Sequence, residues 1–179
     1  MYLVTLYFDD KTNKILERYI RLLSEKTGND FMIAHEVPPH LTISQIESRD
    51  ENILFSAMDR LQKNLSEGVV DFVSVGMFLP SVLYAAPVYN ASLDMIVKQV
   101  FEAFESIPDI RISQRYQPMS FVPHVTLGKT LSKEQMQEAV KVMQEYFVPF
   151  RGETVEVGLS KVNPFCDLVR FRLESESNV

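Results

Sequence analysis

The sequence is poor in the residues that link small proteins through covalent bonds or metals. It contains one cysteine, Cys166, and three histidines among 179 residues. One cysteine cannot form an internal disulfide, and no Cys/His cluster has the spacing of a zinc site. We therefore expect a reduced, cytoplasmic protein that holds no metal and needs no cofactor.

Long apolar runs are also missing, since no stretch approaches the length of a membrane span. The apolar segment 1–8 lacks a basic leader and runs directly into Asp9 and Asp10. That pattern disfavours a signal peptide. We expect no membrane partner.

Basic residues are fewer than acidic residues. Lys and Arg number 18 against 24 Asp and Glu, and the net charge is −6. A protein that grips long nucleic acid neutralises many phosphates, so this balance argues against such a partner. It leaves room for a local pocket that holds one phosphate. The 46% hydrophobic content is typical of one well-buried domain, which we expect to be a monomer.

Two histidines occur in nearly the same five-residue frame. Residues 39–43 read Pro-His-Leu-Thr-Ile and residues 123–127 read Pro-His-Val-Thr-Leu. Apolar residues alternate with His and Thr in both, which predicts half-buried strands whose His and Thr share one face. The third histidine, His35, lies five residues before His40 and would face away on a regular strand. We therefore expect His35 on the surface or in a loop rather than in a metal site.

Periodicity and breaker residues predict seven strands and four helices around these motifs. Gly28 and Gly68 are expected to end the first two helices, and Ser132 to Gln135 has the form of a capping box. The predicted strands are 1–8, 37–46, 69–78, 82–89, 123–131, 153–162 and 167–173, and the predicted helices are 11–26, 50–67, 93–104 and 132–143.

The two halves of the chain, 1–79 and 80–179, share one order of elements. Each reads strand, helix, histidine strand, helix, strand, which indicates an internal duplication. Strands alternating with helices predict an α+β or α/β layering. We expect one domain of two duplicated lobes that can exchange strands, with both histidine strands at a central cleft.

Paired His and Thr side chains have a definite chemical use. Histidine titrates near neutral pH, so one imidazole can accept a proton while the other donates one. The hydroxyls of Thr42 and Thr126, on the same faces as the histidines, can donate hydrogen bonds to phosphate oxygens. Such a site needs no metal and forms no covalent intermediate.

The paired motifs resemble those of the 2H phosphoesterase superfamily, which includes bacterial 2′-5′ RNA ligase-like proteins and cyclic nucleotide phosphodiesterases. Residues 82–87 and the following helix also look like the opening of that family's second lobe. The resemblance implies an α+β, two-lobed fold with pseudo-two-fold symmetry and a cleft for a phosphodiester. It implies His40 and His124 as the acid–base pair, with Thr42 and Thr126 holding the phosphate.

The family's typical reaction opens a 2′,3′-cyclic phosphate or makes and breaks a 2′-5′ linkage. The acidic composition favours a nucleotide or short RNA over long RNA. In the loop 109–122, Arg115 can meet a phosphate and Tyr116 can stack on a base; Arg111 and Phe121 lie in the same loop. By strict alternation Ser44 falls on the His40–Thr42 face, as a further donor to the substrate.

Lys129, by the same alternation, falls opposite the His124–Thr126 face and is expected in solvent. Two other functions stay open. The chain can be a non-catalytic module that binds a nucleotide in the same cleft. It can also perform the same chemistry on a non-nucleic phosphodiester such as ADP-ribose cyclic phosphate.

Overall fold

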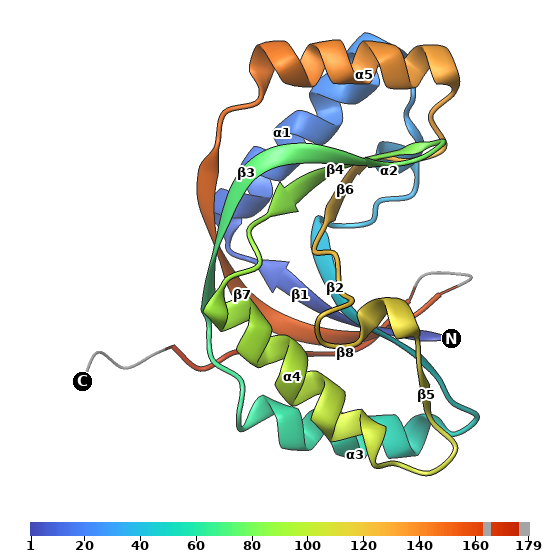
Figure 1. Cartoon of the computed structure of the whole chain (residues 1–179), viewed down its shortest axis with the longest axis vertical. Coiled ribbons are helices and arrows are strands. Elements are labelled where there is room, and N and C mark those ends of the chain that lie inside the picture. Colours follow the sequence, from blue (N-terminus) through green and yellow to red (C-terminus); the bar gives the residue numbers. More distant parts are fainter. Residues whose placement is uncertain (163–165, 176–179) are drawn as a thin grey trace.

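The computed structural model describes residues 1–162 and 166–175 of the chain. Figure 1 shows helices at both ends of the molecule, with a curved sheet between them. The elements are β1 (Tyr2–Phe8), α1 (Asp10–Thr27), α2 (Phe31–Ala34), β2 (His40–Glu47), α3 (Glu51–Gln62), β3 (Gly68–Phe78), β4 (Val82–Pro87), α4 (Ala91–Glu105), β5 (Arg111–Ile112), the 3₁₀ turn η1 (Gln114–Tyr116), β6 (Val125–Gly128), α5 (Lys133–Tyr146), β7 (Phe150–Lys161) and β8 (Cys166–Arg172).

The helix ends follow the local sequence. The side chain of Asp9 caps α1 at its start, and Gly28 ends it with φ of 69°, a conformation that glycine adopts without strain. The predicted capping box between Ser132 and Gln135 is present at the start of α5. One prediction was wrong: α3 stops at Gln62, and Gly68 begins β3 instead of ending the helix.

One antiparallel sheet runs through the molecule in the order β5-β2-β1-β7-β3-β4-β6, with β8 on β7. The two halves exchange strands, since β7 pairs with β1 and β3 pairs with β4. Helices α3 and α4 pack together beside β2, whereas α1 and α5 pack together beside β6 and β4. Figure 1 shows these two helix pairs at opposite ends. The predicted α+β class is confirmed.

The exchange gives the sheet a pseudo-two-fold arrangement. The order β2-β1-β7 on one side of the centre corresponds to β6-β4-β3 on the other, and β3 pairs with β7 at the centre. The rings of Phe8, Phe72 and Phe150 meet there, with Phe72 and Phe150 stacked at 4.6 Å between centroids. One hydrophobic core therefore joins both lobes.

The sheet has two unlike faces, and bulges change which residues point to each face. The pairs Tyr7–His40 and Thr5–Thr42 share one face, because residues directly opposite each other in an antiparallel pair point the same way. Following the register through β7, β3 and β4 places Tyr84 and Thr126 on that same face. Leu6, Leu41, Ala85 and Val125 occupy the opposite, helix-covered face and are fully buried. We call the first of these the histidine face.

Candidate active site

His40 begins β2 and His124 directly precedes β6, and both rings are held in the same way. The Nδ1 atom of His40 lies 2.8 Å from the Pro38 carbonyl oxygen, and that of His124 lies 2.9 Å from the Val122 carbonyl oxygen. A carbonyl oxygen only accepts, so each Nδ1 must carry its proton and donate it. The Nε2 atom of each ring is therefore the one that gains and loses a proton.

Burial and nearby charges change the pKa values of both histidines. Burial lowers the pKa of His40 below its ordinary value near 6.5, the Pro38 carbonyl raises that pKa, and a positive charge on His124 lowers it further. Burial also lowers the pKa of His124. Strands β2 and β6 contact each other, so the curved sheet brings the two motifs into one region. Both imidazoles are biased toward the neutral form.

Thr42 and Thr126 accompany the histidines on the histidine face. Thr42 is only 6% exposed, and Thr126 is half-buried opposite Tyr84. Their hydroxyls are candidate donors to a group held between the two motifs. The structure thus places all four motif residues on one face of one sheet.

Aromatic rings pack beside both histidines. Phe78 and Tyr84 meet the His124 ring edge to face, with centroids 4.8 and 5.6 Å away. Tyr7 lies beside His40 with centroids 6.5 Å apart. Each tyrosine comes from the strand next to the histidine strand and crosses a glycine of the third strand, Gly158 for Tyr7 and Gly76 for Tyr84.

A pocket of about 720 Å³ opens beside His124. Its lining includes the predicted substrate-binding residues Arg115 and Tyr116, both from η1. The other lining residues are chiefly apolar and come from the β3–β4 hairpin and the segment before His124: Met77, Phe78, Leu79, Ser120 and Val122. The pocket therefore combines one cation, aromatic faces and an imidazole.

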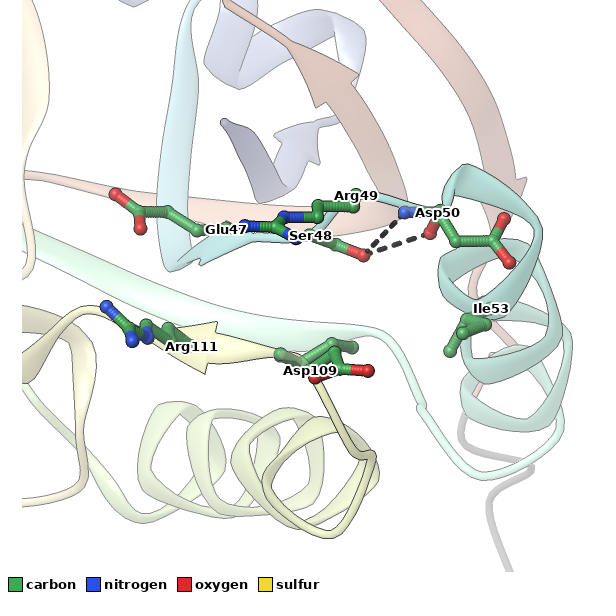
Figure 2. Close-up of a pocket in the computed structure, with 8 residues that line it drawn as sticks. Glu47, Ser48, Arg49, Asp50, Ile53, Asp109 and Arg111 are labelled. Atoms are coloured by element: carbon green, nitrogen blue, oxygen red, sulfur yellow. Dashed lines mark hydrogen bonds between the residues drawn. The ribbon is translucent and has the colours of Figure 1, made fainter.

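The other residues predicted in the loop 109–122 lie elsewhere. Phe121 is only 8% exposed and packs against Tyr89 and Tyr116, so it is a core residue. Arg111 lines a separate pocket of about 740 Å³ with Glu47, Arg49 and Asp109 (Figure 2). Because Glu47 lies seven residues along β2 from His40, this second pocket is roughly 23 Å from the histidine.

The prediction that Ser44 shares the face of His40 and Thr42 was wrong. A bulge leaves Ile43 unpaired, so Thr42 pairs with Thr5 whereas Ser44 pairs with Val4 on the opposite face. Ser44 is 1% exposed, and its hydroxyl has no hydrogen-bond partner among the described residues. Ser44 therefore does not reach the histidine face.

Lys129 is exposed, as predicted, but a matching bulge contradicts the predicted face. Thr126 pairs with Tyr84 and Gly128 with Leu83, so Leu127 is unpaired and the alternation reverses after it. Lys129, directly after the strand, returns toward the histidine face. Its Nζ lies 5.6 Å from the Phe31 ring centroid, and its charge lowers the pKa of His40. Strict alternation missed this cation, because a bulge cannot be recognised in so short a motif.

His35 is exposed, as predicted, and its ring stacks on Phe31 at 4.0 Å. Within residues 1–162 and 166–175, no group of three or more His, Cys, Asp or Glu side chains is arranged to hold a metal ion. In the same part of the chain, no helix is long and apolar enough to cross a membrane.

Comparison with solved structures identifies the class to which this fold belongs. A phosphoesterase aligns over 97% of this chain and 98% of its own length, with a TM-score of 0.61 and 13% identity. TT0787 of Thermus thermophilus aligns over 98% and 99%, with a TM-score of 0.60 and 16% identity. LigT of E. coli, in complex with 3′-AMP, aligns over 96% and 97%, with a TM-score of 0.60 and 17% identity. The fold is that of the 2H phosphoesterases.

The sequence comparison is more specific. Residues 20–163 match the model of the 2′-5′ RNA ligase superfamily, and the chain belongs to this superfamily. The resemblance drawn from the two motifs is thus confirmed. No curated protein matches the sequence as a close relative. Membership of the superfamily makes the protein an enzyme of phosphodiester bonds in nucleotides or RNA.

Proposed function

We propose that the chain is a metal-independent phosphodiesterase that opens 2′,3′-cyclic phosphates or hydrolyses 2′-5′ linkages in a nucleotide or short RNA. The observation that carries this proposal is the shared geometry of the two motifs. Both histidines donate from Nδ1 to a backbone carbonyl, so that Nε2 is the atom that titrates in each ring. The contact between β2 and β6, together with the lowering of the His40 pKa by a positive charge on His124, supports action on one substrate.

In the proposed reaction, one neutral imidazole removes a proton from the attacking water through Nε2. The water oxygen bonds to phosphorus, and the bond from phosphorus to the ribose 3′ oxygen breaks. The other imidazole, protonated beforehand, gives its Nε2 proton to that leaving oxygen. The product is a 2′-phosphomonoester, and protons and charge balance without a metal.

The charge that builds up on the phosphate needs donors. Thr42 and Thr126 supply hydroxyl groups from the histidine face. Lys129 adds a nearby positive charge, consistent with its effect on the pKa of His40. Preorganised donors of this kind contribute about 3 to 4 kcal/mol each to transition-state stabilisation.

The rest of the substrate is proposed to occupy the pocket beside His124. Arg115 would pair with a second phosphate or a ribose edge, and Tyr116 and Phe78 offer ring faces for a base. E. coli LigT, which shares this fold, has been crystallised with 3′-AMP and with phosphate. Those complexes support a nucleotide-sized ligand for the pocket. The net charge of −6 favours such a ligand over long RNA.

The deciding experiment is a turnover panel with the full chain in the presence of EDTA. The substrates are the four 2′,3′-cyclic nucleotides, a 2′-5′-linked dinucleotide and ADP-ribose cyclic phosphate, with products identified by phosphorus NMR. We expect conversion of at least one nucleotide to a 2′-phosphate. Exclusive turnover of ADP-ribose cyclic phosphate would assign the same chemistry to a non-nucleic substrate. Tight binding of 3′-AMP without any turnover would instead identify a binding module.

A further inference from the structure

The surroundings of the two histidines differ in one respect that the pseudo-symmetry does not predict. Beside His124, the Tyr84 ring packs against Phe78 at 4.4 Å, and the contacts are aromatic. Beside His40, the corresponding Tyr7 carries a charged network. The Tyr7 hydroxyl donates a 2.7 Å hydrogen bond to Asp167 on β8.

Arg170 completes this network from the same strand. Its guanidinium lies 3.5 Å above the centroid of the Tyr7 ring and pairs with Asp167. The other terminal nitrogen of the guanidinium lies 3.4 Å from a carboxylate oxygen of Glu156 on β7. A cation can stack on an aromatic ring and also pair with a carboxylate that is hydrogen-bonded to the hydroxyl of that ring. Together these contacts restrain both the ring and the carboxylate.

The strand register places this network next to His40. Tyr7 is directly opposite His40 in the β1–β2 pair. One row along the sheet, Arg170 pairs with Gly158, Gly158 with Thr5, and Thr5 with Thr42. Gly158 makes room for the ring, since a Cβ there would lie 2.9 Å from a Tyr7 ring carbon. The network thus extends the histidine face from β2 across β1 and β7 to β8.

We propose that Tyr7, Asp167 and Arg170 form a positioning unit for His40, in which the Tyr7 ring lies beside the imidazole and is held by Asp167 and Arg170. The inference rests on the proposed function for its role in catalysis. Tyr7 limits the space open to the His40 ring, and Asp167 supplies the negative charge. No carboxylate occupies the equivalent place beside His124 in the part of the chain that the structure describes.

Several nearby charges change the pKa of His40, and they do so in opposite directions. Lys129 and a protonated His124 lower its pKa, whereas Asp167 raises it; burial lowers it most. The hydroxyl of Tyr7 stays protonated, because burial and the Asp167 carboxylate both raise its pKa. Asp167 is therefore the acidic group of the network whose removal should change the protonation of His40.

The test measures the pKa of each histidine in the free protein by NMR titration, assigned with single His variants. We expect Asp167→Asn to lower the pKa of His40 and to change that of His124 much less. Tyr7→Phe should have a smaller effect, because the ring stays and only the hydroxyl contact is lost. In the active enzyme, the limb of the pH–kcat/KM profile that belongs to His40 should shift to lower pH.

Asp71→Asn is the matched control. Asp71 pairs with Arg151 at 2.8 Å in an exposed ion pair, at the place where β3 and β7 meet in the centre of the sheet. It should leave both histidine pKa values unchanged. An unmoved His40 pKa in Asp167→Asn, or an equal shift in Asp71→Asn, would overturn the inference. Because the titration needs no turnover, an inactive wild-type protein would count only against the proposed function.

Discussion

His40 begins β2 and His124 directly precedes β6, and these two strands contact each other although four others separate them in the sheet. This contact requires the sheet to curve. The bulges after Thr42 and Thr126 contribute, because bulges increase local twist and bend the strand. The same device occurs at the same place in both motifs, directly after the threonine.

The first prediction concerns this pair. His40→Ala and His124→Ala should each lower kcat on the best substrate of the EDTA panel by about 10²- to 10⁴-fold, the usual contribution of an acid–base group. The double variant should lose little more than the worse single variant, because both groups serve one transition state. Steady-state kinetics on the three variants measures this.

His35→Ala is the control, since the exposed His35 ring stacks on Phe31 and contacts neither motif histidine in the ring contacts of the described residues. It should retain the wild-type rate. If either His40→Ala or His124→Ala kept nearly full activity, the two-histidine mechanism would be wrong.

Sequence patterns predicted the elements well where the signal was local. The C-terminal cap of α1 at Gly28 and the capping box that begins at Ser132 each depend on only a few neighbouring residues. Both are present as predicted. The end of α3 was missed because Leu65 is buried like a helical residue although it follows the helix. Burial alone therefore did not distinguish a helix from the coil that packs beside it.

The motif residues followed from alternation, but their neighbours did not. A bulge reverses alternation, so Ser44 and Lys129 were both assigned to the wrong face. The charged network of Tyr7 and Asp167 joins residues from opposite ends of the chain. Residues so far apart in the sequence leave no periodic pattern that could predict their contact. They come together because β7 pairs with β1 and also with β8.

The second prediction concerns Lys129. If its ammonium group offsets phosphate charge, Lys129→Ala should raise KM and lower kcat/KM by about 10-fold or more, equivalent to roughly 1.4 kcal/mol. Lys133→Ala, in the exposed first turn of α5, removes the same charge four residues away and should have little effect. Equal losses in the two variants would indicate that the lysine acts through the overall electrostatic field of the protein rather than through a contact with the phosphate.

Arg115 and Arg111 offer a matched comparison within one loop. Arg115 lines the pocket beside His124, whereas Arg111 lines the separate pocket at the far end of β2 (Figure 2). Arg115→Ala should weaken binding of 3′-AMP, measured by calorimetry, and Arg111→Ala should leave it unchanged. The reverse result would move the proposed substrate site to the second pocket.

The pH dependence follows from the lowered pKa values of His40 and His124. One imidazole must be neutral and the other protonated, so kcat/KM should be bell-shaped with its maximum on the acidic side of pH 6.5. Stability has a related dependence. A histidine with a lowered pKa in the folded state stabilises the fold above its unfolded pKa, and this stability is lost as pH falls through the folded pKa.

Urea unfolding at a series of pH values from 7.5 downward measures this loss. In a variant with both His40 and His124 changed to Gln, the part of the pH dependence due to these residues should disappear. An optimum well above pH 7, or an unchanged stability slope in the double variant, would contradict the assignment of neutral, buried histidines.

The last prediction tests whether Gly76 makes room for the ring of Tyr84. A Cβ at Gly76 would lie 2.4 Å from the ring of Tyr84, and that ring contacts His124. Gly76→Ala should therefore displace the ring, cost about 1–3 kcal/mol of unfolding free energy and lower kcat through His124. In a Tyr84→Ala background the three closest contacts of that Cβ are removed, and the same substitution should cost much less. Additive costs in the double variant would show that the ring is not what glycine accommodates.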